Sequence, residues 1–166
     1  MRLIGRITAF VCLFTLSVMA TAAERFGVVD VRAALFASNA AKSFSQQLKK
    51  DFRGEEGKLK SVGEQAQKLQ DRLKKDGAMM SESERARVAE EFEEKAKEFN
   101  YLKNKFEATV SKRKQKFLLE SKPKVDAAIL KIAKANRVQI LFPKEATLWV
   151  DGKFDLTDQV IAELNR

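Results

Sequence analysis

The fold of this chain is decided by residues 48–73, which read LKKDFRGEEGKLKSVGEQAQKLQDRL. Apolar residues recur at every seventh position of this stretch, and a second apolar series lies between them, with Glu55 as its one break. The first series is Phe52, Leu59, Ala66 and Leu73, and the second is Leu48, Val62 and Leu69. Steps of three and four residues place both series on one face of a helix, so the stretch predicts a coiled-coil-like helix.

A second stretch, residues 88–117, repeats this spacing. One series is Phe92, Phe99 and Phe106, and Val88, Leu102 and Thr109 belong to the interleaved series. The phase then shifts to Val110 and Phe117, a stutter of the kind that locally unwinds a supercoil. The pattern predicts a second long helix with its own apolar face.

The two helical stretches are separated by residues 76–84, which read DGAMMSESE. Gly77 is a natural helix stop, and Ser81 followed by Glu84 forms a capping box that starts a new helix. The sequence therefore predicts an antiparallel helical hairpin over residues 40–122, with its tip near residues 76–81. Arms of about 35 to 40 residues reach roughly 55 to 60 Å, which is far more than a compact domain of this size needs. We expect the hairpin to project as an arm.

Both ends of the chain contain short apolar, β-branched runs that are typical of strands. Residues 26–31, FGVVDV, predict a buried strand and lead into a helical turn over residues 32–39. Residues 138–142 and 146–150 predict two further strands joined by a turn at 143–145, and Asp155 or Thr157 can cap a final helix. The predicted fold class is α+β. Residues 23–39 and 123–166 are expected to form a small body with a short β-sheet, and the helical hairpin is inserted between its strands.

This body is too small to bury a substantial core, and a short sheet leaves open edges that invite pairing. The sequence therefore predicts a homo-oligomer assembled through the body. The residues expected to build this oligomerisation body are Val28, Val29, Val31, Phe36, Ile140, Leu141, Leu148 and Val150.

Residues 1–22 predict a secretory signal peptide. Arg2 and Arg6 precede an apolar run over residues 7–19, and residues 20–22 read ATA, a small-x-small cleavage site. An uncleaved anchor is the alternative, but the apolar run is shorter than the about 20 residues that span a bilayer. We expect export and a mature chain that begins near Ala23.

Composition argues against an enzyme. The chain has no His, and its one Cys is Cys12, inside the predicted signal peptide. No imidazole-based triad, zinc site or thiol nucleophile is therefore expected, and we predict no metal, no cofactor and no catalysis. A phosphate-binding loop is not expected either, because residues 54–58, GEEGK, lack the spacing and the strand that such a loop needs.

Positive charge is concentrated on the predicted hairpin. The chain has 32 Lys+Arg against 23 Asp+Glu, and residues 40–122 hold 21 of the former and 15 of the latter. The densest basic arm patch is Lys112, Arg113, Lys114 and Lys116. A solvated helical face is the usual explanation, but net charge on a projecting arm also favours encounter with acidic partners. We expect no physiological nucleic acid, since the aromatic residues follow the heptad rather than a base-stacking arrangement.

The phenylalanines of the hairpin admit two interpretations. They can form the seam between the two helices, or they can stay partly exposed and offer an adaptable surface together with the methionines at the tip. Both can hold for different residues. The candidates for binding a partner protein through such a surface are Met79, Met80, Phe92, Phe99 and Phe106. Three glycines within the first helix, Gly54, Gly57 and Gly63, are either tolerated surface residues or a device that makes the arm compliant.

The two ends of the chain resemble the Skp/OmpH family of periplasmic chaperones. The likeness rests on residues 26–31 followed by Phe36, and on the succession of residues 138–141, 148–150 and 155–158, with Trp149 where the family often has Tyr. The resemblance implies a homotrimer whose bodies share a small β-barrel and whose helical tentacles enclose a cavity. It also implies an ATP-independent holdase for unfolded outer-membrane β-barrel proteins, with lipopolysaccharide or an anionic membrane surface as a further partner. A structural coiled-coil spacer or adaptor of the cell envelope is the alternative.

Overall fold

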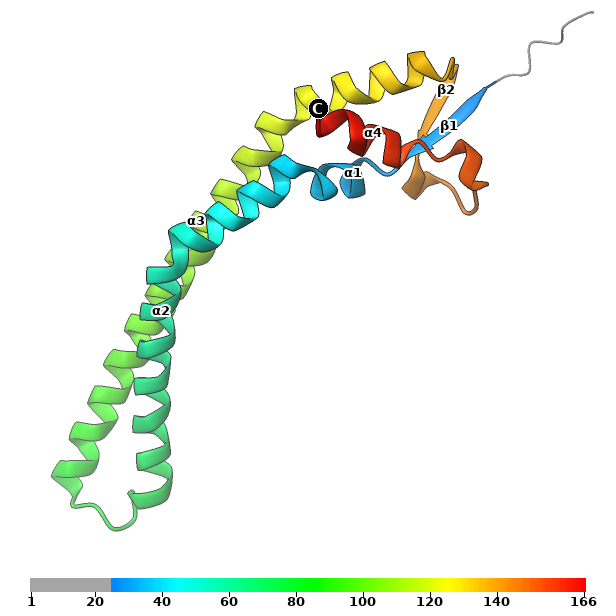
Figure 1. Ribbon diagram of the computed structural model, residues 1–166. Coiled ribbons are helices and arrows are strands. Elements are labelled where there is room, and N and C mark those ends of the chain that lie inside the picture. Colours follow the sequence, from blue (N-terminus) through cyan, green and yellow to red (C-terminus); the bar gives the residue numbers. More distant parts are fainter. Residues whose placement is uncertain (1–24) are drawn as a thin grey trace, which may run out of the picture.

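The computed structural model describes residues 25–166, which form a small base and a long arm (Figure 1). The base holds strand β1 (Phe26–Val29), helix α1 (Val31–Ala37), strand β2 (Ile140–Pro143) and helix α4 (Thr157–Leu164). The 3-10 turns η1 (Lys144–Ala146) and η2 (Gly152–Phe154) lie between β2 and α4. The arm is an antiparallel pair of helices, α2 (Asn39–Asp76) and α3 (Glu82–Ala135). The predicted α+β architecture with a projecting hairpin is confirmed.

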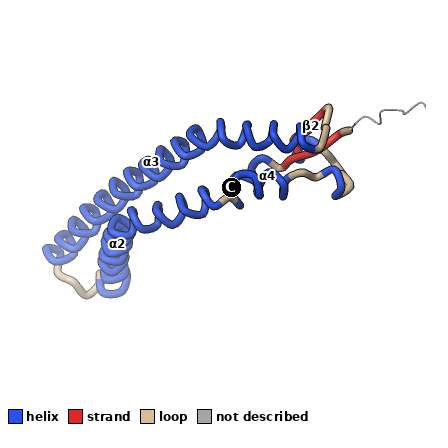
Figure 2. Tube along the Cα trace, turned by 45° about the horizontal axis from the view of Figure 1, so that its top comes forward, coloured by secondary structure: helices blue, strands red, loops and turns tan. Residues whose placement is uncertain are grey.

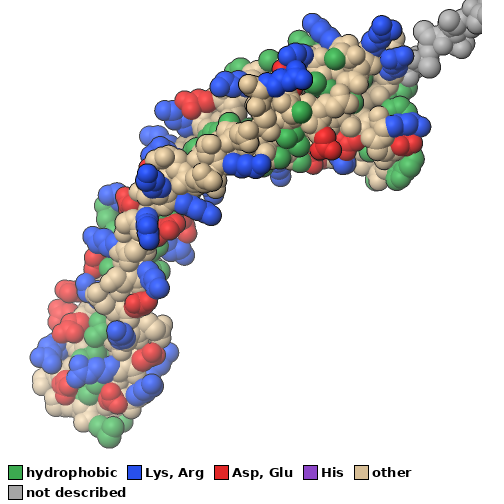
Figure 3. Space-filling model, in the orientation of Figure 1, with side chains coloured by type: hydrophobic (Ala, Val, Ile, Leu, Met, Phe, Trp, Pro, Cys, Tyr) green, Lys and Arg blue, Asp and Glu red, His purple; other side chains and the backbone are tan. Residues whose placement is uncertain are grey.

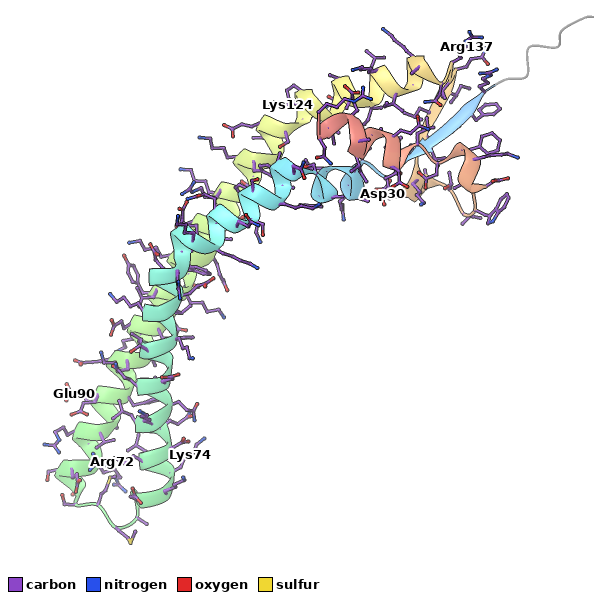
Figure 4. All side chains as sticks on the ribbon, viewed as in Figure 1. Asp30, Arg72, Lys74, Glu90, Lys124 and Arg137 are labelled. Carbon is purple, nitrogen blue, oxygen red and sulfur yellow. The ribbon has the colours of Figure 1, made fainter. Side chains whose placement is uncertain are left out.

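The arm has the predicted length. Helix α2 has 38 residues, which corresponds to about 57 Å. Helix α3 has 54 residues because it continues past the arm into the base, and Figure 2 shows it running from the tip to the strands. Pro123 lies inside α3, and the helix changes direction near Lys124, which is labelled in Figure 4. A proline removes one helical hydrogen bond and crowds the preceding turn, which accounts for a change of helix direction at this point.

The tip is closed by the residues that the sequence singled out. Helix α2 ends at Asp76, and Gly77 is its cap, where a Cβ atom would collide with the carbonyl oxygen of Leu73. The Ser81 hydroxyl accepts a hydrogen bond from the Glu84 amide at 3.2 Å, as predicted for the start of α3. The Glu84 carboxylate does not complete the capping box, because it accepts a hydrogen bond from Arg72 of α2 at 2.6 Å. This contact ties the two helices together at the tip.

The base contains a two-stranded parallel sheet. β1 pairs with β2 in the register Phe26 with Ile140 to Val29 with Pro143. The other edge of β1 is occupied near Val28, whose carbonyl accepts the Leu156 amide at 2.9 Å. The predicted strand over residues 146–150 is not formed. Thr147 instead bonds back to the Lys144 carbonyl through both its amide and its hydroxyl, which closes a turn where that strand would begin.

The core of the base draws on every helix except α2. Its buried residues are Val29, Ala34, Ala128, Leu156 and Val160. Helix α4 lies between α1 and the end of α3, so the last part of α3 belongs to this core. The Asp30 amide donates to the Thr157 hydroxyl at 2.9 Å, which fixes the end of β1 to the start of α4. Sequence segments more than 120 positions apart therefore build one core.

Candidate binding surface

The two arm helices meet along the predicted seam. Phe44 and Phe117 stack with ring centroids 4.3 Å apart, and Phe52 meets Phe106 edge to face at 5.5 Å. Val62 and Val88 are buried. All the predicted heptad positions are buried or half-buried except Thr109, which is exposed. The heptad prediction is therefore confirmed, and the aromatic residues supply much of the contact.

The predicted client-binding phenylalanines lie in this seam. Phe92, Phe99 and Phe106 are half-buried, so part of each ring remains accessible at the edge of the helix pair. Phe99 faces Gly63, where an added Cβ would lie 3.0 Å from its ring. The two methionines of the tip differ: the side chain of Met79 is 83% exposed, whereas Met80 is half-buried. Met79 thus offers the most open apolar side chain of the arm.

The basic arm patch is exposed, but half of it is paired. Arg113 of α3 contacts Asp51 of α2 at 3.0 Å, and Lys116 contacts Glu120 at 3.7 Å. Within the described part of the chain, neither Lys112 nor Lys114 has a carboxylate oxygen within 4.0 Å. These two lysines can therefore attract an acidic partner without breaking an existing ion pair.

The residues predicted for the oligomerisation body divide into two groups. Val28 and Val29 are buried within the single chain, and Leu141 and Val150 are half-buried. Val31, Phe36, Ile140 and Leu148 are exposed, and Leu148 is fully so. Sequence reasoning missed further exposed apolar residues of the base, namely Phe26, Leu130, Phe142, Trp149 and Phe154. Nine of the 13 exposed large apolar residues thus belong to the base, and Figure 3 shows apolar side chains at that end of the molecule.

Charged side chains stabilise the segment that leads into α4. Burial raises the pKa of Asp155, but hydrogen bonds from the Lys144 ammonium group and from Thr157 outweigh it and lower the pKa below its ordinary value. The hydrogen bond to Asp155 in turn raises the pKa of Lys144. At the C-terminal end of α4, the hydrogen bond from Lys131 lowers the pKa of Glu163. These pairs hold α4 to the rest of the base.

Residues 25–166 contain no group of three or more Asp, Glu, Cys or His side chains placed to hold a metal ion. In the same part of the chain, no helix combines the length and the apolar character that crossing a membrane requires.

The chain is thus a helical-hairpin protein, in which a long pair of helices stands on a small α+β base and apolar side chains are exposed at both ends. The model of the family described as "Outer membrane protein (OmpH-like)" matches residues 25–164, and the chain belongs to this family. It is 29% identical over 165 residues to the Skp-like protein of Pseudomonas aeruginosa strain PAO1, covering 97% of this chain and 98% of that protein.

A solved structure shows the same fold. It is described as a putative outer membrane chaperone (OmpH-like) from Caulobacter crescentus CB15, and it matches with a TM-score of 0.57 and 18% sequence identity. The match covers 86% of this chain and 84% of that one. The family resemblance drawn from the two ends of the sequence is confirmed by these comparisons.

Proposed function

We propose that this chain is an ATP-independent holdase chaperone of the periplasm, which binds unfolded outer-membrane β-barrel proteins and keeps them from aggregating until they insert. The observation that carries the proposal is the arm, a projecting helix pair with half-buried phenylalanines along its sides and an open methionine at its tip. Two of its lysines, Lys112 and Lys114, have no carboxylate within 4.0 Å among the described residues. Membership of the OmpH-like family supports it, as does the fold shared with the putative chaperone from Caulobacter crescentus.

The physical chemistry of such clients suits this surface. Unfolded outer-membrane proteins expose alternating apolar residues and have no membrane to bury them in. A holder that binds weakly at many points, through arms that share a cavity, gains strength from multivalency and releases the client without nucleotide. Basic charge speeds the capture of acidic segments and does so less at high salt.

We further propose that three copies assemble through the base. A single chain leaves Ile140, Phe142, Leu148 and Trp149 in contact with water, which favours a partner surface. The base also has a core of only five buried residues, and shared packing would add to it.

Export to the periplasm forms part of the proposal. It rests on the signal peptide predicted for residues 1–22, which lie outside the described residues. Lipopolysaccharide or an anionic membrane surface is proposed as an additional partner of the basic arm. The net positive charge of residues 40–122 supports this choice.

The test is an aggregation assay on a urea-unfolded outer-membrane β-barrel protein diluted into buffer. Light scattering is expected to fall to baseline at one trimer per client, without ATP, and the suppression is expected to be stronger at low ionic strength. Native mass spectrometry is expected to show three copies with one client. The same client in its folded state serves as the control. Binding of folded client alone would favour the spacer or adaptor alternative, and absent suppression or a requirement for ATP would reject the holdase.

A further inference from the structure

A groove lies at the root of the arm, where α1, α2 and α3 meet. Its volume is about 280 Å³, which is just below the ~300–1,000 Å³ of small-molecule sites and suits one or two inserted side chains. Its main lining residues are Phe36, Phe44, Leu48, Lys114, Phe117 and Leu118. Five of these six side chains are apolar, so the groove is suited to an apolar group.

The groove is preformed and open. Phe44 and Phe117 stack with an interplanar angle of 11° and form part of its wall from α2 and α3. Phe36 of α1 is 57% exposed and Leu118 of α3 is 43% exposed. Exposed aromatic and aliphatic side chains beside a stacked pair provide a surface onto which another apolar side chain can be added.

Positive charge gathers at the same end of the arm. Residues 40–59 and 101–122 hold 12 Lys+Arg and 5 Asp+Glu, a net charge of +7. Residues 60–100, which form the tip half, hold 9 Lys+Arg and 10 Asp+Glu, a net charge of −1. Figure 3 shows basic and acidic side chains intermixed on the tip half. The positive charge of the hairpin thus belongs to the half that contains the groove.

Lys114 places one of these charges in the groove itself. Its neighbour Arg113 is neutralised by Asp51 at 3.0 Å, whereas no carboxylate of the described residues lies within 4.0 Å of Lys114. An unpaired ammonium group beside an apolar groove selects a ligand that combines an apolar side chain with an adjacent carboxylate.

We propose that this groove is a docking site for a segment of unfolded polypeptide in which an aromatic or aliphatic residue is flanked by Asp or Glu. The inference rests on the proposed holdase function and assigns part of client binding to the root of the arm rather than to its tip. Charge argues against the arm root of a second copy as the occupant, because that part would bring another net charge of +7.

The test uses two fluorescent peptides with the same Phe and Leu residues, one flanked by Asp and the other by Lys. Fluorescence anisotropy with the full chain in its native assembly is expected to show tighter binding of the Asp peptide. Lys114→Glu is expected to weaken the Asp peptide about five-fold, equivalent to about 1 kcal/mol, and to strengthen the Lys peptide. Lys68→Glu is the matched control, since Lys68 is an exposed lysine of the tip half without a carboxylate within 4.0 Å among the described residues. It is expected to change neither affinity by more than two-fold.

The apolar part of the site is tested separately. Leu118→Ala is expected to weaken both peptides equally, whereas Leu119→Ala, which removes the neighbouring exposed leucine outside the groove, is expected to leave both unchanged. A benzoylphenylalanine crosslinker at position 118 is expected to capture the Asp peptide. Crosslinks that join two copies of the chain in the presence of peptide would assign the groove to a subunit interface and overturn the proposal.

These outcomes separate the groove from the holdase function. Suppressed aggregation with equal peptide binding by wild type and Lys114→Glu would overturn the groove and leave the holdase standing. Selective binding of the Asp peptide without suppressed aggregation would support the groove and reject the holdase.

Discussion

Replacing Gly54 and Gly57 with alanine is expected to stiffen the arm, whereas the same change at Gly63 is not. The sequence leaves open whether these glycines are tolerated or make the arm compliant. The structure distinguishes Gly63, which faces a phenylalanine, from Gly54 and Gly57, which do not. An added Cβ at Gly54 or Gly57 meets no atom within 4 Å, so both positions face water. At Gly63 it would lie 3.0 Å from Cε2 and 3.3 Å from Cδ2 of Phe99. That contact requires the ring to move within the seam.

The magnitude follows from helix propensity. Alanine is favoured over glycine by about 0.8–1 kcal/mol in an exposed helix interior, so the double variant gains about 1.6–2 kcal/mol. At Gly63 the same gain is opposed by crowding against Phe99, and overpacking typically costs about 1–3 kcal/mol. We therefore expect Gly63→Ala to be neutral or destabilising, because the two terms have similar size and opposite sign.

Hydrogen exchange of residues 50–66, measured by mass spectrometry, is the assay. Local opening in the Gly54→Ala, Gly57→Ala double variant is expected to slow by roughly 15- to 30-fold, the factor that corresponds to this gain. Gly63→Ala serves as the internal comparison. If alanine at each of the three positions slowed hydrogen exchange equally, Gly63 would not approach Phe99, and the helix register along the seam would be wrong. Unchanged exchange in the double variant would show that opening of this segment does not depend on the two exposed glycines.

Three further predictions concern the ends of the molecule. Asp155→Asn is expected to lower the free energy of unfolding of the base at neutral pH. The difference in the free energy of unfolding between variant and wild type is expected to vanish as the pH falls through the lowered pKa of Asp155. The reason is that a carboxylate with a depressed pKa stabilises the fold only while it is ionised. Urea titration at several pH values measures this difference. Arg137→Gly is expected to raise the melting temperature and to increase the free energy of unfolding by about 1 kcal/mol. Arg137 has a φ of 53° in the turn that ends α3, a backbone conformation that glycine adopts without penalty. A lowered melting temperature would contradict the assigned backbone. Limiting hydrogen peroxide is expected to convert Met79 to its sulfoxide before Met80, since Met79 is 83% exposed and Met80 half-buried, and peptide mass spectrometry gives the order.

Local patterns determined much of the arm. The heptad series identified nearly every residue of the seam because helix periodicity is a short-range property that a single stretch of sequence displays. Ser81 predicted the start of α3 because a capping side chain bonds to a backbone amide only a few residues away. The same reasoning predicted a helix at the end of the chain and a strand over residues 26–31, of which only 26–29 form β1 because Asp30 caps α1. The two ends together also indicated the family, and the comparisons confirmed it.

Long-range contacts decided what the sequence could not. Residues 146–150 have the composition of a strand, but Thr147 bonds back to the Lys144 carbonyl through both its amide and its hydroxyl, so the chain closes a turn where that strand would begin. The apolar residues of the base look alike in sequence, yet Val29 is buried and Leu148 is fully exposed. The Glu84 carboxylate does not make its predicted capping bond because it pairs with Arg72 of the facing helix. Pairing, burial and charge neutralisation depend on which distant segments meet, and only the tertiary structure determines that.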